Sequence, residues 1–494
     1  MKGKFDKKHK VRVSLLIIFL LAVSLRCLMP AYLLVKQNKP LRYMQISSYA
    51  WDMISMSISI AKGEGINLEY LNYAEKFTGI ITPSLDKIEK GTHPRPFWFA
   101  DKGGLPQIFI ASLITRTLNS FNVPVIQIFQ GIIDSLGCFL VFGILSFFFS
   151  YRICRLGALF YAISPVFIFY SYHFMSEAYI PVLMLAIGYT IIKALHRGKW
   201  QWFALAGFLI GLSLSFRSDN ILILPFYMGF VIWFYRRRLS RALMMAVVLS
   251  IFAIFAYMPF QMAFPKSSEK VSTIGVALYN SLGEYPANYK GKRFFDDNST
   301  IKYAPEKANT YLEKNDQIFK LMYDASQSSL FFGMFKPITK YDLTTLAYVR
   351  EIIISKPLLY ANWLVSRFFA YLPSHPFLAS TAYFFNSLEL PMREYRHSAL
   401  FNFVKYIDYF CFLVFVYGVW LARRNSKLLS LLCIYFGVLV THVIVGCGEV
   451  YFRNDLEYAY LDPRYLLGMI SLSPVFLAIA FGRTEAKATE KDNN

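Results

Sequence analysis

Charged side chains lie inside or at the ends of long apolar segments of this sequence, where a charge costs a few kcal/mol and so points to a function. Asp52 follows the first apolar segment, beside Trp51. A partly buried carboxylate there could act as a general base for an incoming hydroxyl, with a solvated helix charge as the alternative. Arg26 and Arg464 carry planar, bidentate donors that suit a phosphate group. These residue types indicate hydroxyl activation and phosphate binding beside a membrane.

Most of these charges also have a structural interpretation, which the sequence alone leaves open. Arg26 could extend its side chain to the outer lipid headgroups. Asp134, inside an apolar segment, could be hydrogen-bonded to a neighbouring helix. Glu177 stands at a helix start, where an acid is a good cap. Arg217 and Asp219 could form an interfacial ion pair.

The sequence gives few signs of a metal site or a disulfide framework. His93 and Asp101 flank a His-Pro-Arg-Pro run and are weak metal candidates, because two ligands are too few to define a site. We therefore expect no certain cofactor and leave a divalent metal open. The six cysteines form no Cys-x-x-Cys pair and lie mostly within apolar segments, which argues against disulfides and thiolate metal ligation.

Composition places the chain among polytopic membrane proteins. Its 494 residues are 56% hydrophobic and 18% aromatic, and the mean hydropathy is +0.39, which is too apolar for an ordinary soluble protein. The formal net charge of +21 could suggest nucleic acid, but no nucleic-acid motif accompanies it. Much of the excess lies in short loops, where membrane topology and anionic headgroups explain it.

The spacing of the basic clusters predicts the membrane topology. Clusters follow every second apolar segment, at 152–155, 197–199, 236–241 and 423–427, and the N-terminus is also basic. Basic residues in short loops stay in the cytoplasm. Both termini are then cytoplasmic, whereas Asp52, Glu177 and Asp219 fall on the outer face.

We expect an all-α polytopic membrane fold with about ten transmembrane helices and a periplasmic-type outer lobe. The predicted spans are 13–35, 122–149, 153–172, 176–195, 200–217, 220–236, 241–261, 401–422, 427–446 and 464–482. The corresponding domains are a catalytic core over 1–261 with an outer loop at 36–121, the outer lobe at 262–400, the C-terminal helices at 401–482 and a cytoplasmic tail at 483–494.

Three shorter elements are expected outside these spans. Trp51, Ile54, Ile58 and Ala61 recur at helical spacing, which predicts a short amphipathic helix that ends at a Gly-Glu-Gly turn. Residues 104–118 are apolar but short, and an eleventh span would invert every later basic cluster. We therefore interpret them as an interfacial or re-entrant helix. An amphipathic stretch within 343–372 should pack on the membrane surface.

Several motifs, in this order and spacing, resemble the membrane core of GT-C glycosyltransferases, and above all the branch of protein O-mannosyltransferases and lipid A aminoarabinose transferases. The motifs are Gln130-Gly-Ile-Ile-Asp134, Arg152-Ile-Cys-Arg155, Ala158 to Pro165, Ser176-Glu177-Ala-Tyr, Gly207 to Pro225, Leu282-Gly-Glu-Tyr-Pro with Asp296-Asp297, and Asp462-Pro-Arg-Tyr465. The resemblance covers most of residues 10–482 and implies a GT-C-like helix bundle.

The resemblance also implies roles for the charged residues. Members of the family take a sugar from a polyprenyl-phosphate donor at the outer membrane face and pass it to an acceptor hydroxyl or phosphate. By position, Asp52 matches the catalytic base and Glu177 a second catalytic acid, whereas Arg26, Arg217 and Arg464 match the residues that hold the donor phosphate.

One departure from the family pattern puts the identity of the base in doubt. Asp52 lies about one helical turn closer to Gly63 than the family pattern leads us to expect, and Met56 stands where an aromatic residue is common. Glu64 and Asp101 are the reserve candidates.

The resemblance therefore predicts a hexosyl or pentosyl transferase with a polyprenyl-phosphate sugar donor and a glycan, lipid or protein acceptor. The sequence shows no obvious eukaryotic targeting signal, so we expect the protein in the bacterial cytoplasmic membrane. One alternative is a lipid-linked sugar flippase. The charged residues in or near the predicted spans, however, lie mostly on the outer side, and no inverted repeat is visible in the sequence. The other is an O-antigen ligase or polymerase, which usually lacks an acidic helix after the first span.

Overall fold

The structure is a computed structural model. It describes residues 2–36, 48–66, 69–70, 81–90, 104–172, 174, 176–263, 346–347, 350, 353–354, 357–371, 399–445 and 463–481, for some of them the backbone only. His93, Asp101, most of the predicted outer lobe and the tail at 483–494 lie outside these residues.

Helices long and apolar enough to cross a membrane confirm a multi-pass membrane protein. Five segments meet this description within the described residues: Val11–Leu28, Val123–Leu145, Ser176–Arg197, Leu239–Ala263 and Ser426–Ile444. They belong to α1 (Lys2–Lys36), α5 (Val123–Ser135) with α6 (Gly137–Leu145), η4 (Ser176–Tyr179) with α9 (Ile180–Arg197), α12 (Leu239–Ala263), and α23 (Ser426–Leu429) with α24 (Leu432–Val445).

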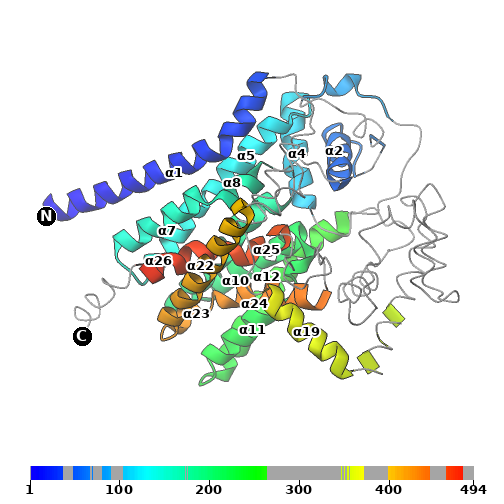
Figure 1. Cartoon of the computed structure of the whole chain (residues 1–494). Helices are drawn as coiled ribbons and strands as arrows, with labels where there is room; N and C mark the ends of the chain where they lie inside the picture. Colours follow the sequence, from blue (N-terminus) through cyan, green and yellow to red (C-terminus); the bar gives the residue numbers. More distant parts are fainter. Residues whose placement is uncertain are drawn as a thin grey trace.

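The other predicted spans fall on bent or shorter helices. They are α7 (Tyr151–Ile163) with α8 (Pro165–Ser171), α10 (Trp200–Phe216), α11 (Ile223–Phe234), α22 (Ala399–Ala422), and α25 (Pro463–Ile470) with α26 (Ser473–Phe481). Every predicted span thus contains helix, while the count of ten crossings stays a prediction. Figure 1 shows these helices gathered into one bundle.

Two boundaries differ from the sequence expectation. α1 begins at Lys2 rather than near residue 13, so the basic N-terminal residues continue the first membrane helix. The predicted continuous span 153–172 is broken between α7 and α8, which meet at 47°. Pro165 explains the break, because proline lacks an N–H and its ring clashes with the carbonyl four residues earlier.

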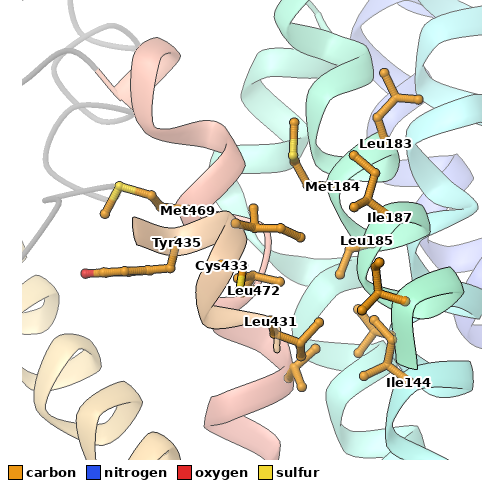
Figure 2. Packing of buried hydrophobic residues seen from close by; sticks show 14 of the residues in the cluster. Ile144, Leu183, Met184, Leu185, Ile187, Leu431, Cys433, Tyr435, Met469 and Leu472 are labelled. Atoms are coloured by element: carbon orange, nitrogen blue, oxygen red, sulfur yellow. The ribbon is translucent and has the colours of Figure 1, made fainter. Parts of the chain in front are cut away.

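Small residues let helix backbones touch in the bundle core. A Cβ added to Gly207 or Gly211 of α10 would lie 2.1 Å or 2.0 Å from a backbone oxygen of α12. Such close approach is the usual way in which membrane helices associate. Elsewhere large side chains fill the space: residues of α6, α9, α24 and α25, such as Met184 and Cys433, form one apolar cluster (Figure 2).

Basic loops meet at one end of the bundle, which we call the basic end. Arg241 Nη2 donates to the Gly198 carbonyl at 2.7 Å. Lys427 Nζ lies 3.2 Å from His196 Nδ1, and the His196 ring stacks on Phe147 with centroids 5.0 Å apart. Loops far apart in sequence therefore share one end, as the topology prediction requires.

The sequence also predicted three short elements, of which the first two lie at the opposite end of the bundle. α2 (Ser48–Ala61) is the expected short helix, and Gly63 and Gly65 follow it with φ of 82° and 80°. Unlike an amphipathic surface helix, it is buried on several faces, since Ser55, Ser57 and Ser59 have no exposed surface. α4 (Leu105–Leu118) packs on α2 and spans only about 21 Å, too short to cross a bilayer upright. α19 (Pro357–Tyr371) falls within the predicted stretch 343–372 and contacts α24.

Candidate functional site

An ion pair between Arg217 and Glu177 marks the candidate site. Arg217 Nη1 lies 2.7 Å from Glu177 Oε1, and the two side chains are 11% and 14% exposed. Ser176 Oγ donates to the other carboxylate oxygen at 3.2 Å. Two residues that the family resemblance assigned to different tasks, a catalytic acid and a phosphate ligand, therefore lie in direct contact.

The end of α10 explains why Arg217 reaches this position. α10 stops at Phe216, and Arg217 turns to an extended conformation with φ −151° and ψ 118° while its N–H still bonds to Ser213 O. Asn220 Nδ2 donates to the same carbonyl at 3.3 Å. The helix terminus is thus capped, and the arginine side chain projects at the end of the bundle opposite the basic end.

Gly104 joins α2 and α4 to the ion pair. Its N–H donates to Ser215 O at 3.0 Å, shortly before Arg217 in the chain. A Cβ on Gly104 would lie 2.8 Å from Met53 Cε and 4.0 Å from Ser176 Cβ. The α2 turn that contains Asp52 therefore lies beside the residues that carry the ion pair. The Asp52 side chain itself is outside the described residues.

Arg464 belongs to the same end of the bundle. It is the second residue of α25, whose Gly468 packs against Met184 near the start of α9. Ala478, further along, packs against Gly157 of α7, close to the basic end. The chain from α25 to α26 thus runs toward the basic end, and Arg464 starts this run at the other end. Its side chain is outside the described residues.

Arg26 lies elsewhere, buried within the bundle. Its side chain has no exposed surface, and its Nε lies 2.5 Å from Asp134 Oδ2. Nη1 and Nη2 donate to the carbonyls of Ala162 and Tyr161 at 2.9 Å and 3.1 Å. This geometry gives no support to the expected phosphate contact, nor to a side chain that extends to the headgroups. It confirms that Asp134 is hydrogen-bonded to a neighbouring helix, because the Tyr161 hydroxyl donates to Oδ1 at 2.6 Å.

The reserve base Glu64 is held in the outer loop. Lys90 Nζ lies 3.3 Å from its carboxylate, and the Tyr70 hydroxyl donates to it at 2.8 Å. Burial, and then the Glu64 carboxylate, raise the pKa of Tyr70. Within the described residues no three His, Cys, Asp or Glu side chains gather as metal ligands.

Sequence reasoning missed two residues that organise these regions. Gly104 was assigned only to the start of a short helix, although a glycine before a Leu-Pro helix start is a signal for a left-handed turn. Tyr161 was not singled out, yet it stands four residues before Pro165, where a helix carbonyl loses its usual donor.

One family model matches part of this membrane bundle. Residues 106–260, from α4 into α12, match the family model of dolichyl-phosphate-mannose-protein mannosyltransferases, so the resemblance to GT-C glycosyltransferases is confirmed over this segment. The segment contains both Glu177 and Arg217. It is less than half of the chain, and a comparison with curated proteins gives no match.

Two solved structures are similar over nearly the whole chain. One is the archaeal oligosaccharyltransferase AglB from Archaeoglobus fulgidus in complex with an inhibitory peptide and a dolichol-phosphate, at 15% identity and a TM-score of 0.48. The match covers 99% of this chain and 52% of AglB, so the chain spans about half the length of that protein. The other is ArnT from Cupriavidus metallidurans bound to undecaprenyl phosphate, at 12% identity, a TM-score of 0.32, and coverage of 99% and 79%.

Proposed function

We propose that this protein is a membrane glycosyltransferase, which moves a sugar from a polyprenyl-phosphate donor to an acceptor. The observation that carries the proposal is the partly exposed Arg217–Glu177 pair, which lies beside α2 and inside the segment that matches the mannosyltransferase family. A bilayer-anchored donor would bring its phosphate to this end of the bundle, since the lipid tail occupies the membrane.

The charges at this end suit the reaction. As the acceptor oxygen bonds to the anomeric carbon, the sugar–phosphate C–O bond breaks and its electron pair leaves with the phosphate. Arg217 and Arg464 would stabilise that developing charge, and preorganised electrostatic contacts often contribute more to catalysis than any other single effect. Asp52 would take the acceptor's proton. Glu177 would hold the Arg217 guanidinium toward the phosphate.

The proposal includes a location. We place the site on the outer face of a bacterial cytoplasmic membrane with both termini in the cytoplasm, because the basic end follows the positive-inside rule. The lobe at 262–400 would cover the site and select a glycan, lipid or protein acceptor. Whether the donor carries a hexose or a pentose is decided by screening both.

The direct test uses membranes that contain the protein and a set of radiolabelled polyprenyl-phosphate sugars. Wild type should transfer label from at least one donor, and Asp52→Asn should lose this transfer. Asp86→Asn is the matched control, because Asp86 is an exposed acid of the same outer segment. Equal transfer by wild type and Asp52→Asn would show that Asp52 is not the base. Movement of intact donor lipid across vesicles without sugar release would instead establish a flippase.

A further inference from the structure

The break between α7 and α8 leaves backbone carbonyls without helical partners. The last four carbonyls of any helix lack an intrahelical donor, and in α7 these include Tyr161 O and Ala162 O. Pro165, four residues after Tyr161, has no N–H to offer. Ser164 N–H reaches Tyr161 O only at 3.4 Å. Inside a bilayer, such groups must find a partner within the protein.

Arg26 of α1 supplies those partners. One guanidinium nitrogen donates to Ala162 O at 2.9 Å and the next to Tyr161 O at 3.1 Å, while Nε binds Asp134 of α5. The positive charge also lies at the C-terminal end of α7, where the helix dipole favours a cation. Arg26 therefore caps a broken helix from a neighbouring one.

Two glycines of the neighbouring span make room for this cap. A Cβ on Gly131 would lie 3.0 Å from Arg26 Cβ, and one on Gly137 would lie 2.3 Å from Tyr161 Cζ. The cap is deep in the bilayer: Arg26 is roughly 21 Å along α1 from Arg12, and Ala162 is roughly 15 Å along α7 from Arg152. No water is available there to replace the arginine.

The far end of α8 is held by the same two helices. The Tyr172 hydroxyl donates to Leu25 O on α1, and Gln127 Nε2 of α5 donates to Tyr172 O. Figure 1 shows α8 beside α5 and α7, and α1 also contacts it. Glu177 lies in η4, which contacts both α8 and α5, so the position of α8 influences where Glu177 lies.

We infer that Arg26, with Asp134, is a positioning residue of the transferase: it fixes the bend between α7 and α8 and thereby places Glu177 against Arg217. This inference rests on the proposed function. In this inference Arg26 does not contact the substrate. It acts indirectly, by setting the position of α8 and of Glu177.

The test separates positioning from folding. Arg26→Met with Asp134→Leu removes both charges, and replacing a buried ion pair by apolar residues is often neutral for stability. Arg26→Lys keeps the charge but loses the planar fork that serves two carbonyls at once. Both variants should stay folded with an unfolding temperature lowered by the carbonyl hydrogen bonds that they lose. They should keep the donor KM and lose kcat by up to about 10²-fold, since small misplacements cost this much. Leu20→Ala is the control, because Leu20 of α1 is 52% exposed.

A second readout needs no activity. Spin labels at Leu28→Cys and Ile168→Cys, in a background without the six native cysteines, measure the spacing of α1 and α8. Arg26→Lys should change or broaden that distance. An unchanged distance and unchanged kcat in a folded Arg26→Lys protein would overturn the inference. If wild type transfers no sugar from any donor, the proposed function fails, while the distance measurement still decides whether Arg26 sets the bend.

Discussion

Two arginine–carboxylate pairs within the described residues have similar geometry and different surroundings. Arg26 and Asp134 meet at 2.5 Å with side chains 0% and 2% exposed, and backbone carbonyls and a tyrosine hydroxyl complete their hydrogen bonds. Arg217 and Glu177 meet at 2.7 Å with 11% and 14% exposure, at the end of the bundle where α2, α4 and α10 converge.

The comparison shows that surroundings, rather than pairing, separate a structural arginine from one suited to a substrate. A buried pair depends on both partners, because the loss of one leaves an uncompensated charge in low dielectric. A pair with some access to water is screened more than a fully buried one, so the loss of one partner should cost less stability. It can, however, exchange contacts with a ligand that arrives at this end of the bundle.

The largest expected effect is on the buried pair. Arg26→Met leaves Asp134 without its cation and should lower the free energy of unfolding by about 3–5 kcal/mol. Thermal unfolding in detergent measures this, with Leu20→Ala of the same helix as the control. If Arg26→Met is as stable as wild type, the buried pair does not contribute more to stability than the Arg217–Glu177 pair.

The Arg217–Glu177 pair, which we call the rim pair, should matter more for activity than for stability. Arg217→Gln should reduce sugar transfer by about 10²–10³-fold, in the range seen when one preorganised donor to a developing negative charge is removed. Its unfolding free energy should fall by less than that of Arg26→Met, because the partner Glu177 keeps some access to water. Transfer assays beside thermal unfolding test this, and the exposed neighbour Ser218→Ala should change neither. A large loss of stability in Arg217→Gln would make this pair structural as well.

Gly104 tests whether α2 is positioned against the rim pair. Gly104→Ala forces an L residue to a φ of 98° and brings its Cβ to 2.8 Å from Met53 Cε, so we expect a loss of about 1–3 kcal/mol in stability. Met53→Ala should recover part of this loss by removing the clash. Gly229→Ala is the matched control, with nothing within 4 Å of the added Cβ. No difference between the two glycine variants would contradict the assigned packing.

The smallest effect concerns the outer loop. Tyr70→Phe removes the hydrogen bond to Glu64 and should cost about 1 kcal/mol at neutral pH. Because the folded state raises the pKa of Tyr70, this contribution is fully present below the ordinary tyrosine pKa and declines as pH rises through the raised value. Unfolding curves of both proteins should therefore converge at strongly alkaline pH. A gap that widens with pH would reverse the assigned sign.

Much of the secondary structure followed from local signals. The apolar segments predicted where helices lie, and the periodicity of Ile54 and Ile58 predicted α2. The basic clusters predicted which loops share an end, and the contact of Lys427 with His196 agrees. These features depend on a residue and its near neighbours, or on the bilayer itself, so they are readable from one chain.

The pairing of the charges was decided by the tertiary structure. The sequence left Asp219 open as a possible partner of Arg217, whereas the structure brings Glu177 from 40 residues away. Arg26 was expected to contact the donor phosphate, with the lipid headgroups as the alternative, yet its partner Asp134 is 108 residues distant on α5. Which acid meets which arginine depends on the faces and heights at which helices pack, and those are set by contacts such as Gly131 against Arg26 that no local pattern encodes.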